Sequence, residues 1–157
     1  MSKLQLHNSK VLKLTNVLKC KLDLADEELD FQGQIIKMES FIRSKGAVQV
    51  GPLIQYINPY VNDQEEVDME IILMLQCNNF IHKLEEPYSM DSVIRVTDCM
   101  YCRYQGPEEK LKYAYDKIGT EAFEYDIELN GDNYTIMVSQ NEEEEIIVAD
   151  VFMPRKE

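Results

Sequence analysis

The sequence has no tryptophan, only two histidines and no long apolar run. A transmembrane helix needs about 20 predominantly apolar residues, and no segment approaches that length. Residues 1–19 contain lysines, but they lack a continuous apolar stretch and the small residues of a signal-peptide cleavage site. We therefore expect a cytoplasmic protein that has no membrane partner.

The sequence signatures of several enzyme classes are also missing. There is no P-loop, no G-x-G-x-x-G stretch, no H-E-x-x-H motif and no Ser-His-Asp set. A binding or interaction protein is therefore favoured over an enzyme. We expect neither a metal ion nor another cofactor.

Positive charge is scarce, with 16 lysines and arginines against 29 aspartates and glutamates, which gives a net charge of -13. Such an acidic chain repels phosphate backbones, so nucleic acid is not an expected direct partner. Cationic ligands or basic protein partners are favoured instead. Part of the negative charge lies in the run Glu142–Glu145, which is typical of a solvated loop.

Cysteine is sparse, with four residues in all. Cys99 and Cys102 have the C-x-x-C spacing that occurs in zinc sites and redox motifs. They lie in a predicted strand, however, where residues three apart point to opposite faces. No second C-x-x-C and no nearby histidine completes a site. Buried free thiols are therefore predicted.

The 157 residues, 45% of them apolar, suit one globular domain with a substantial core. The alternation of Asn16–Leu24 predicts a half-buried strand. Asp26 is then a suitable N-cap for a helix that Gly46 would end. Apolar residues at helical spacing form one face of this helix, namely Phe31, Ile35, Met38 and Ile42.

The same order of elements is predicted twice along the chain. After the first helix, strands are expected at Val48–Ile57 and Val67–Gln76, separated by the polar loop Asn58–Glu66. A second helix is expected to start at Gly106-Pro107, with proline at its first position. The remaining predicted strands are Val93–Tyr104, Tyr134–Ser139 and Ile146–Met153.

An offset of 80 residues superimposes the two β-α-β-β units. It carries the apolar face of the first helix onto that of the second, which consists of Leu111, Tyr115, Ile118 and Ala122. Gly51 falls on Gly131. The pattern predicts a single α+β domain over residues 1–157, with halves at about 16–77 and 93–153. Its antiparallel sheet would carry both helices on one face. Coincidence between two generic units is the alternative.

The segment Arg103–Tyr115, RYQGPEEKLKYAY, resembles a characteristic stretch of the GyrI-like (gyrase-inhibitor-like) family. That family includes the effector-binding domains of multidrug-sensing MerR-type and some AraC-type transcription regulators. Gly51–Tyr56 and Val67–Ile71 resemble the strands of its first half. The likeness covers roughly Val17–Met153 in the family's order. It implies a duplicated βαββ fold with a groove between the halves.

In this family the groove takes small organic molecules, often hydrophobic cations, between aromatic rings and a buried carboxylate. Many members have a glutamate two positions before a tyrosine in the strand after the second helix. This chain has the shorter Asp132 before Tyr134. No helix-turn-helix segment precedes Val17. The resemblance thus implies a stand-alone bacterial ligand-binding domain that does not contact DNA directly.

The alternation of the strands places a second set of residues on the face without helices. Glu70 and Asp150 are related by the 80-residue offset, and Tyr101 and Phe152 lie on the same face. Carboxylates beside aromatic rings suit an organic cation. The candidate ligand-binding residues are Tyr56, Glu70, Tyr101, Tyr134, Asp150 and Phe152.

Other interpretations of this face stay open. Its acids are also typical of the solvated side of an antiparallel sheet. Its apolar members Ile72, Met74 and Phe152 would equally suit a homodimer interface. An acidic protein–protein interaction module is the main alternative function. A small-molecule hydrolase would use Glu70 or Asp150 as general base with Tyr101 or Tyr134.

Overall fold

The computed structural model describes residues 3–156, as an α+β fold with six antiparallel strands and two helices. This confirms the predicted fold class. Neither helix in this part of the chain is long and apolar enough to cross a membrane. The elements are β1 (Lys3–Lys21), α1 (Phe31–Ser44), β2 (Ile54–Val61), β3 (Val67–Gln76), β4 (Tyr88–Gly106), a 3-10 turn (Glu108–Lys110), α2 (Lys112–Glu124), β5 (Asn133–Asn141) and β6 (Ile146–Pro154).

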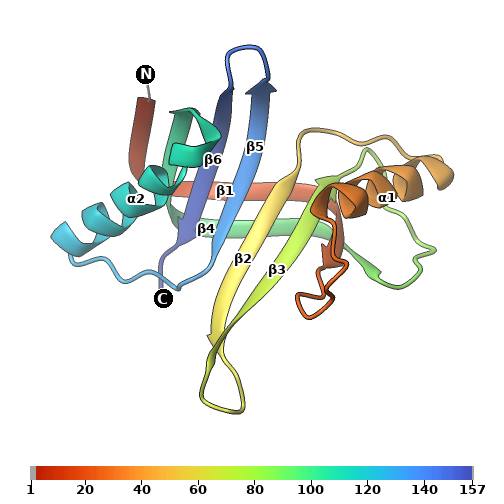
Figure 1. The fold of residues 1–157 in the computed structure, drawn as a ribbon, viewed down its shortest axis with the longest axis horizontal. Coiled ribbons are helices and arrows are strands. Elements are labelled where there is room, and N and C mark those ends of the chain that lie inside the picture. Colours follow the sequence, from red (N-terminus) through yellow and green to blue (C-terminus); the bar gives the residue numbers. More distant parts are fainter. Residues whose placement is uncertain (1–2, 157) are drawn as a thin grey trace.

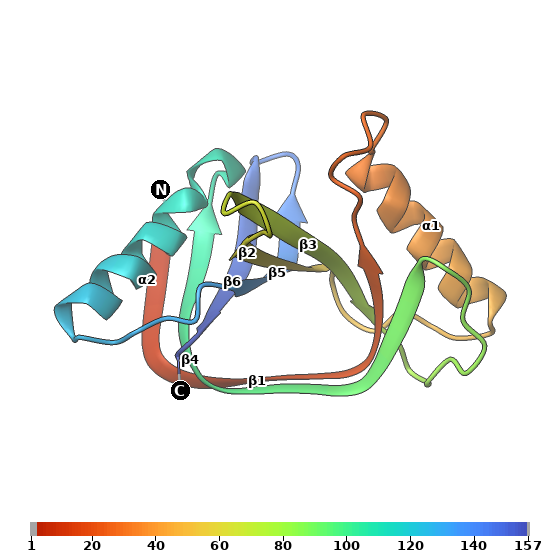
Figure 2. The ribbon, with the colours of Figure 1, turned by 90° about the horizontal axis from the view of Figure 1, so that it is seen from below.

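The sheet closes on itself in the strand order β1-β3-β2-β5-β6-β4, because β4 pairs back onto β1. β1 and β4 are the longest strands, and together they bend into a U (Figure 2). The hairpins β2–β3 and β5–β6 cross this ribbon and meet where β2 pairs with β5 (Figure 1). Closure gives the sheet an inner face and an outer face.

Both helices pack on the outer face, at opposite flanks of the U (Figure 2). Met38 and Ile42 of α1 pack against Leu18, Leu73 and other residues of β1 and β3. α2 covers β4 and β6 in the same way, with Ile118 in the core of its flank. Burial of these apolar faces, rather than helix propensity, is what stabilises helices of 14 and 13 residues.

The inner face has an apolar cluster of its own, separate from the two helix-covered clusters. Its fully enclosed members come from five strands and comprise Leu12, Leu14, Val17, Ile54, Met74, Cys99, Tyr101 and Phe152. Met74 and Leu73 are neighbours in β3, yet they belong to different clusters because successive residues of a strand face opposite ways. The facing predicted for β3, β4 and β6 is therefore confirmed.

The first strand is longer than predicted. It was expected to begin at Asn16 and begins at Lys3, where it pairs with Gln105 of β4. Leu12 and Leu14 alternate with exposed neighbours and point into the inner cluster. The missed half of the strand is held mainly by its long pairing with β4, which is a tertiary contact.

The predicted starts of both helices are also wrong. α1 begins at Phe31 and not after Asp26, because the Asp26 carboxylate accepts the backbone N–H of Glu28 and closes a local turn. Pro107 does not begin α2. A 3-10 turn follows it, and α2 begins at Lys112.

The strand predicted at Val48–Ile57 is shifted, and β2 runs from Ile54 to Val61. Gly51 stands in between with a φ of 88°, a left-handed conformation that favours glycine and interrupts an extended strand. Gly131, 80 residues further on, has a φ of 108° just before β5. The same local geometry thus introduces the second strand of each half.

The enclosed position of Leu73 gives a direct test of the outer core. Its side chain is fully buried beneath α1, so Leu73→Ala should lower the free energy of unfolding by about 2–5 kcal/mol through lost burial and a cavity. Urea denaturation would measure this change. Val67→Ala in the same strand, at a residue 80% exposed, is the control and should change stability by less than about 0.5 kcal/mol. Equal effects of the two substitutions would contradict the assignment of the core.

Candidate functional site

Four of the six predicted site residues form one row of aromatic rings across the inner face. Tyr56 of β2 stands opposite Tyr134 of β5, Tyr134 opposite Phe152 of β6, and Phe152 opposite Tyr101 of β4. The ring centroids of Tyr56 and Tyr134 are 4.6 Å apart, and those of Tyr101 and Phe152 are 4.9 Å apart. Directly opposed residues of neighbouring strands are close enough for such ring contacts. The closed sheet thus brings together side chains from four strands.

The Tyr101 end of this row is already occupied by the protein's own polar groups. Asp150 accepts hydrogen bonds from the Tyr101 hydroxyl at 2.7 Å and from two nitrogens of Arg103 at 2.7 and 2.9 Å. Lys10 holds its ammonium 4.1 Å from the centroid of the Tyr101 ring. A ligand cation here would have to displace Arg103 or Lys10.

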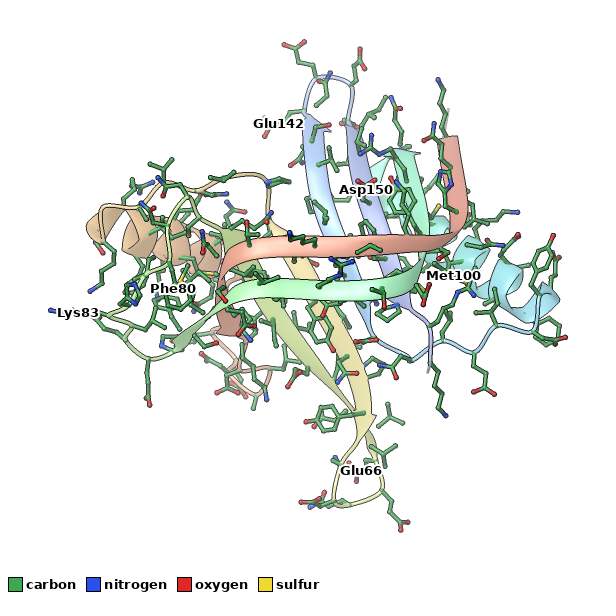
Figure 3. The ribbon with its side chains drawn as sticks, turned by 180° about the vertical axis from the view of Figure 1, so that it is seen from behind. Glu66, Phe80, Lys83, Met100, Glu142 and Asp150 are labelled. Atoms are coloured by element: carbon green, nitrogen blue, oxygen red, sulfur yellow. The ribbon has the colours of Figure 1, made fainter. Side chains whose placement is uncertain are left out.

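Asp150 is 9% exposed and lies on the half of the molecule that carries α2 (Figure 3). The bidentate geometry with Arg103 is the strong form of an ion pair. The pKa of Arg103 lies above its usual value because of this hydrogen bond and the charge of Asp150. We assign Asp150 mainly to the support of the site.

Glu70 has a weaker partner. Its carboxylate lies 3.1 Å from the Lys21 ammonium, and the two side chains are 26% and 65% exposed. An exposed pair of this kind contributes little to stability. Glu70 stands opposite Asn58, two residues along β3 from Ile72, the residue opposite Tyr56, and therefore lies diagonal to that ring. It remains accessible beside the aromatic row.

Asp132 stands at the Tyr56–Tyr134 end of the row. It is 8% exposed, and its carboxylate accepts hydrogen bonds from the Tyr56 hydroxyl at 2.7 Å and the Asn130 amide at 3.2 Å. Within residues 3–156, no basic side chain approaches the Asp132 carboxylate to within 4.0 Å. It is a buried carboxylate that neutral donors alone hold in place.

A groove of about 510 Å³ opens at Asp132 and Tyr134. Its volume falls within the range of small-molecule sites. The lining residues come from β4, from the start of β5 and the segment before it, and from the end of β6 and the residues after it. They are Arg95, Val96, Thr97, Asn130, Asp132, Tyr134, Pro154, Arg155 and Lys156. The groove therefore combines one aromatic ring and one buried carboxylate with several basic groups.

Sequence reasoning found part of this arrangement. Alternation placed Glu70, Tyr101, Asp150 and Phe152 on the face without helices, and Tyr56 and Tyr134 were added as residues of neighbouring strands. The family resemblance identified Asp132. Sequence reasoning missed the hydrogen bond from Tyr56 to Asp132 and the basic lining of the groove. The ion pair of Arg103 with Asp150 could have been found, because the alternation places both on the same face of adjacent strands.

Burial raises the pKa values of the three tyrosines in the row. It raises the pKa of Tyr101 from 10.0 to about 12, with the Asp150 hydrogen bond adding to the effect. Burial and the charge of Asp132 likewise raise the pKa of Tyr134 to about 12. The pKa of Tyr56 rises further, through burial and its bond to Asp132. These phenols therefore stay neutral and act as hydrogen-bond donors or as ring surfaces.

The four cysteines are free and buried, which confirms the prediction. Cys99 belongs to the inner cluster and Cys102 to the cluster under α2, on opposite faces of β4. Burial raises the pKa of Cys99 to about 11. A thiol with a raised pKa is a poor nucleophile and a poor metal ligand at neutral pH.

No family model matches the chain, and no curated protein matches it significantly. Among solved structures, the crystal structure of the EcmrR C-terminal domain is similar, with a TM-score of 0.63 and 15% identity, over 100% of this chain and 98% of that one. EcmrR in a cryo-EM structure of its DNA complex gives a TM-score of 0.70 and 14% identity, over 99% of this chain and 58% of that one.

A crystal structure of a hydrolase from Listeria innocua is also similar, with a TM-score of 0.54 and 10% identity, over 95% of this chain and 92% of that one. At these identities the likeness is one of fold. The chain spans 58% of the EcmrR chain in the DNA complex and nearly all of its C-terminal domain. This fold is consistent with the GyrI-like resemblance of the sequence.

The raised pKa values predict a loss of stability in alkali. Between pH 10 and about 12 the unfolded chain releases its phenolic protons while the native chain keeps those of Tyr101 and Tyr134. The native state then binds more protons, so the free energy of unfolding falls as the pH rises through this window. Urea titrations from pH 9 to 12 should show that the stability difference between the wild type and Tyr101→Phe shrinks. A difference that stays constant over the window would contradict the assignment.

Proposed function

We propose that the protein is a small-molecule-binding domain and that its ligand lies at the Tyr56–Tyr134 end of the inner face. The observation that carries the proposal is the contrast between the two ends of the aromatic row. At Tyr101 the chain supplies its own cations, Lys10 and Arg103. At Asp132, within residues 3–156, it supplies none in direct contact.

The proposed ligand is organic, has an aromatic or other hydrophobic body and carries a cationic group. A cation beside Asp132 would complete a charge pair that the chain leaves open, and the neighbouring ring of Tyr134 adds stacking and cation–π attraction. Glu70 lies diagonal to Tyr56, and its charge adds to the effects that raise the pKa of Tyr56. Tyr101, Asp150 and Phe152 hold the row in place from the far end.

The GyrI-like resemblance of the sequence supports a binding role in a bacterial, cytoplasmic setting, and the fold likeness to the EcmrR C-terminal domain agrees with that resemblance. EcmrR occurs in a complex with DNA, but this chain spans only 58% of it. With its net charge of -13, the chain is proposed to bind a ligand rather than DNA.

The geometry favours this role over hydrolysis. A general base needs a free lone pair directed at water or substrate. Asp150 already accepts three hydrogen bonds, one from the Tyr101 hydroxyl and two from Arg103. Burial also keeps the phenols of Tyr101 and Tyr134 protonated at neutral pH.

Binding of phenyltrimethylammonium, an aromatic cation, tests the proposal. Isothermal titration should detect saturable binding, and the melting temperature should rise with ligand concentration. Asp132→Asn keeps an oxygen that accepts the Tyr56 hydrogen bond but removes the charge, and it should weaken the affinity about tenfold or more.

Glu142→Gln is the matched control, because it changes the net charge equally at the tip of the β5–β6 hairpin (Figure 3). It should leave the dissociation constant unchanged. Absence of binding to the wild type, or equal weakening by both substitutions, would overturn the proposal.

A further inference from the structure

The groove at Asp132 is more basic than the composition of the chain would suggest. The protein has a net charge of -13, yet three basic residues line this groove beside a single acidic one. These are Arg95, Arg155 and Lys156. A ligand that carried only positive charge would be attracted by Asp132 and repelled by the other three groups. The full lining therefore fits a ligand with charges of both signs.

The placement of Arg95 supports this interpretation. Arg95 of β4 stands directly opposite Lys13 of β1, and like charges in that position destabilise a sheet. Within the described residues 3–156, no carboxylate lies within 4.0 Å of the guanidinium of Arg95 or of Arg155. The Arg95 guanidinium therefore has no acidic partner in the described chain and is available to an external carboxylate.

Arg155 also lacks part of its hydrogen bonding within the described residues. One terminal nitrogen of its guanidinium donates to the backbone carbonyl of Asn8, which fixes the side chain at the groove. Its Nε is buried and has no hydrogen-bond partner among the described residues. A buried donor without a partner costs free energy, so the guanidinium of Arg155 is incompletely satisfied by the described chain.

We propose that the groove recognises a zwitterionic aromatic molecule. Its ammonium group would lie against Asp132, its ring on Tyr134, and its carboxylate at Arg95, with Arg155 and Lys156 beside it. An arginine guanidinium is suited to carboxylates because its planar N–H groups match the two oxygens. This inference rests on the proposed function and specifies the chemical class of its ligand.

Three probes with the same phenyl ring and similar chains separate the charges: phenylalanine, phenethylamine and 3-phenylpropionate. Isothermal titration at one pH and one salt concentration should rank phenylalanine about tenfold tighter than phenethylamine, since it adds one charge-assisted contact. Both phenylalanine and phenethylamine should bind more weakly to Asp132→Asn. 3-Phenylpropionate should bind more weakly than phenylalanine because it lacks the ammonium group.

Arg95→Gln should abolish the preference for phenylalanine over phenethylamine, because it removes the partner of the carboxylate. Lys13→Gln is the matched control. It removes the same charge from the residue opposite Arg95, outside the lining of the groove, and should preserve the preference. Both positions are exposed, so neither variant endangers the fold.

The outcomes distinguish this inference from the function on which it rests. If phenethylamine binds through Asp132 and phenylalanine binds no tighter, the ligand is a simple cation and the zwitterion proposal is overturned. A preference that survives in Arg95→Gln, or a tighter binding of 3-phenylpropionate than of phenylalanine, overturns it as well. If neither phenethylamine nor phenyltrimethylammonium binds, the proposed function fails with it.

Discussion

β1 and β4 run antiparallel along nearly all of their length, from Lys3 opposite Gln105 to Cys20 opposite Tyr88. This pairing joins the two β-α-β-β units and closes the sheet. Without it, the hairpins β2–β3 and β5–β6 would meet only through the short contact of β2 with β5. Closure turns the face without helices into an inner face, so the row of aromatic rings is buried at Tyr101 and Phe152 and partly buried at Tyr56 and Tyr134.

Charge is then distributed unevenly over that interior. At one end of the row, Arg103 pairs with Asp150 and the Lys10 ammonium lies over the Tyr101 ring. A polar network whose members are all paired makes this end rigid. At the other end, Asp132 has only neutral donors, while Arg95 and Arg155 have no acidic partner in the described chain. The unpaired charges thus gather in one groove, where an external molecule with complementary charges can pair with them.

Much of the fold could be predicted from the sequence, because it depends on local periodicity. The alternation of β3 gave its bounds and facing, and the apolar faces of both helices lie against the sheet as expected. The 80-residue offset aligns Gly51 with Gly131, and both residues have a positive φ in the structure. The first half of β1 escaped prediction because its partner, β4, lies about 90 residues away in the sequence, and the start of α1 was missed because Asp26 closes a turn instead of capping a helix.

The site could be predicted only in outline. Alternation identified which residues share a face, but it could not show that the face is enclosed or how its acids are paired. The 80-residue offset makes Glu70 and Asp150 equivalent positions. In the structure, however, Glu70 pairs with an exposed lysine, whereas Asp150 forms a bidentate ion pair with an arginine. Arg95 and Arg155 come from distant segments, and only the closed sheet brings them to Asp132.

A crystal structure of the protein grown with phenethylamine tests the central claim most directly. The account predicts electron density for the ring against Tyr134, with the ammonium group within hydrogen-bonding distance of the Asp132 carboxylate. Density for phenethylamine at the Tyr101–Asp150 end would contradict it. An empty groove at Asp132 in crystals grown at a saturating phenethylamine concentration would contradict it as well.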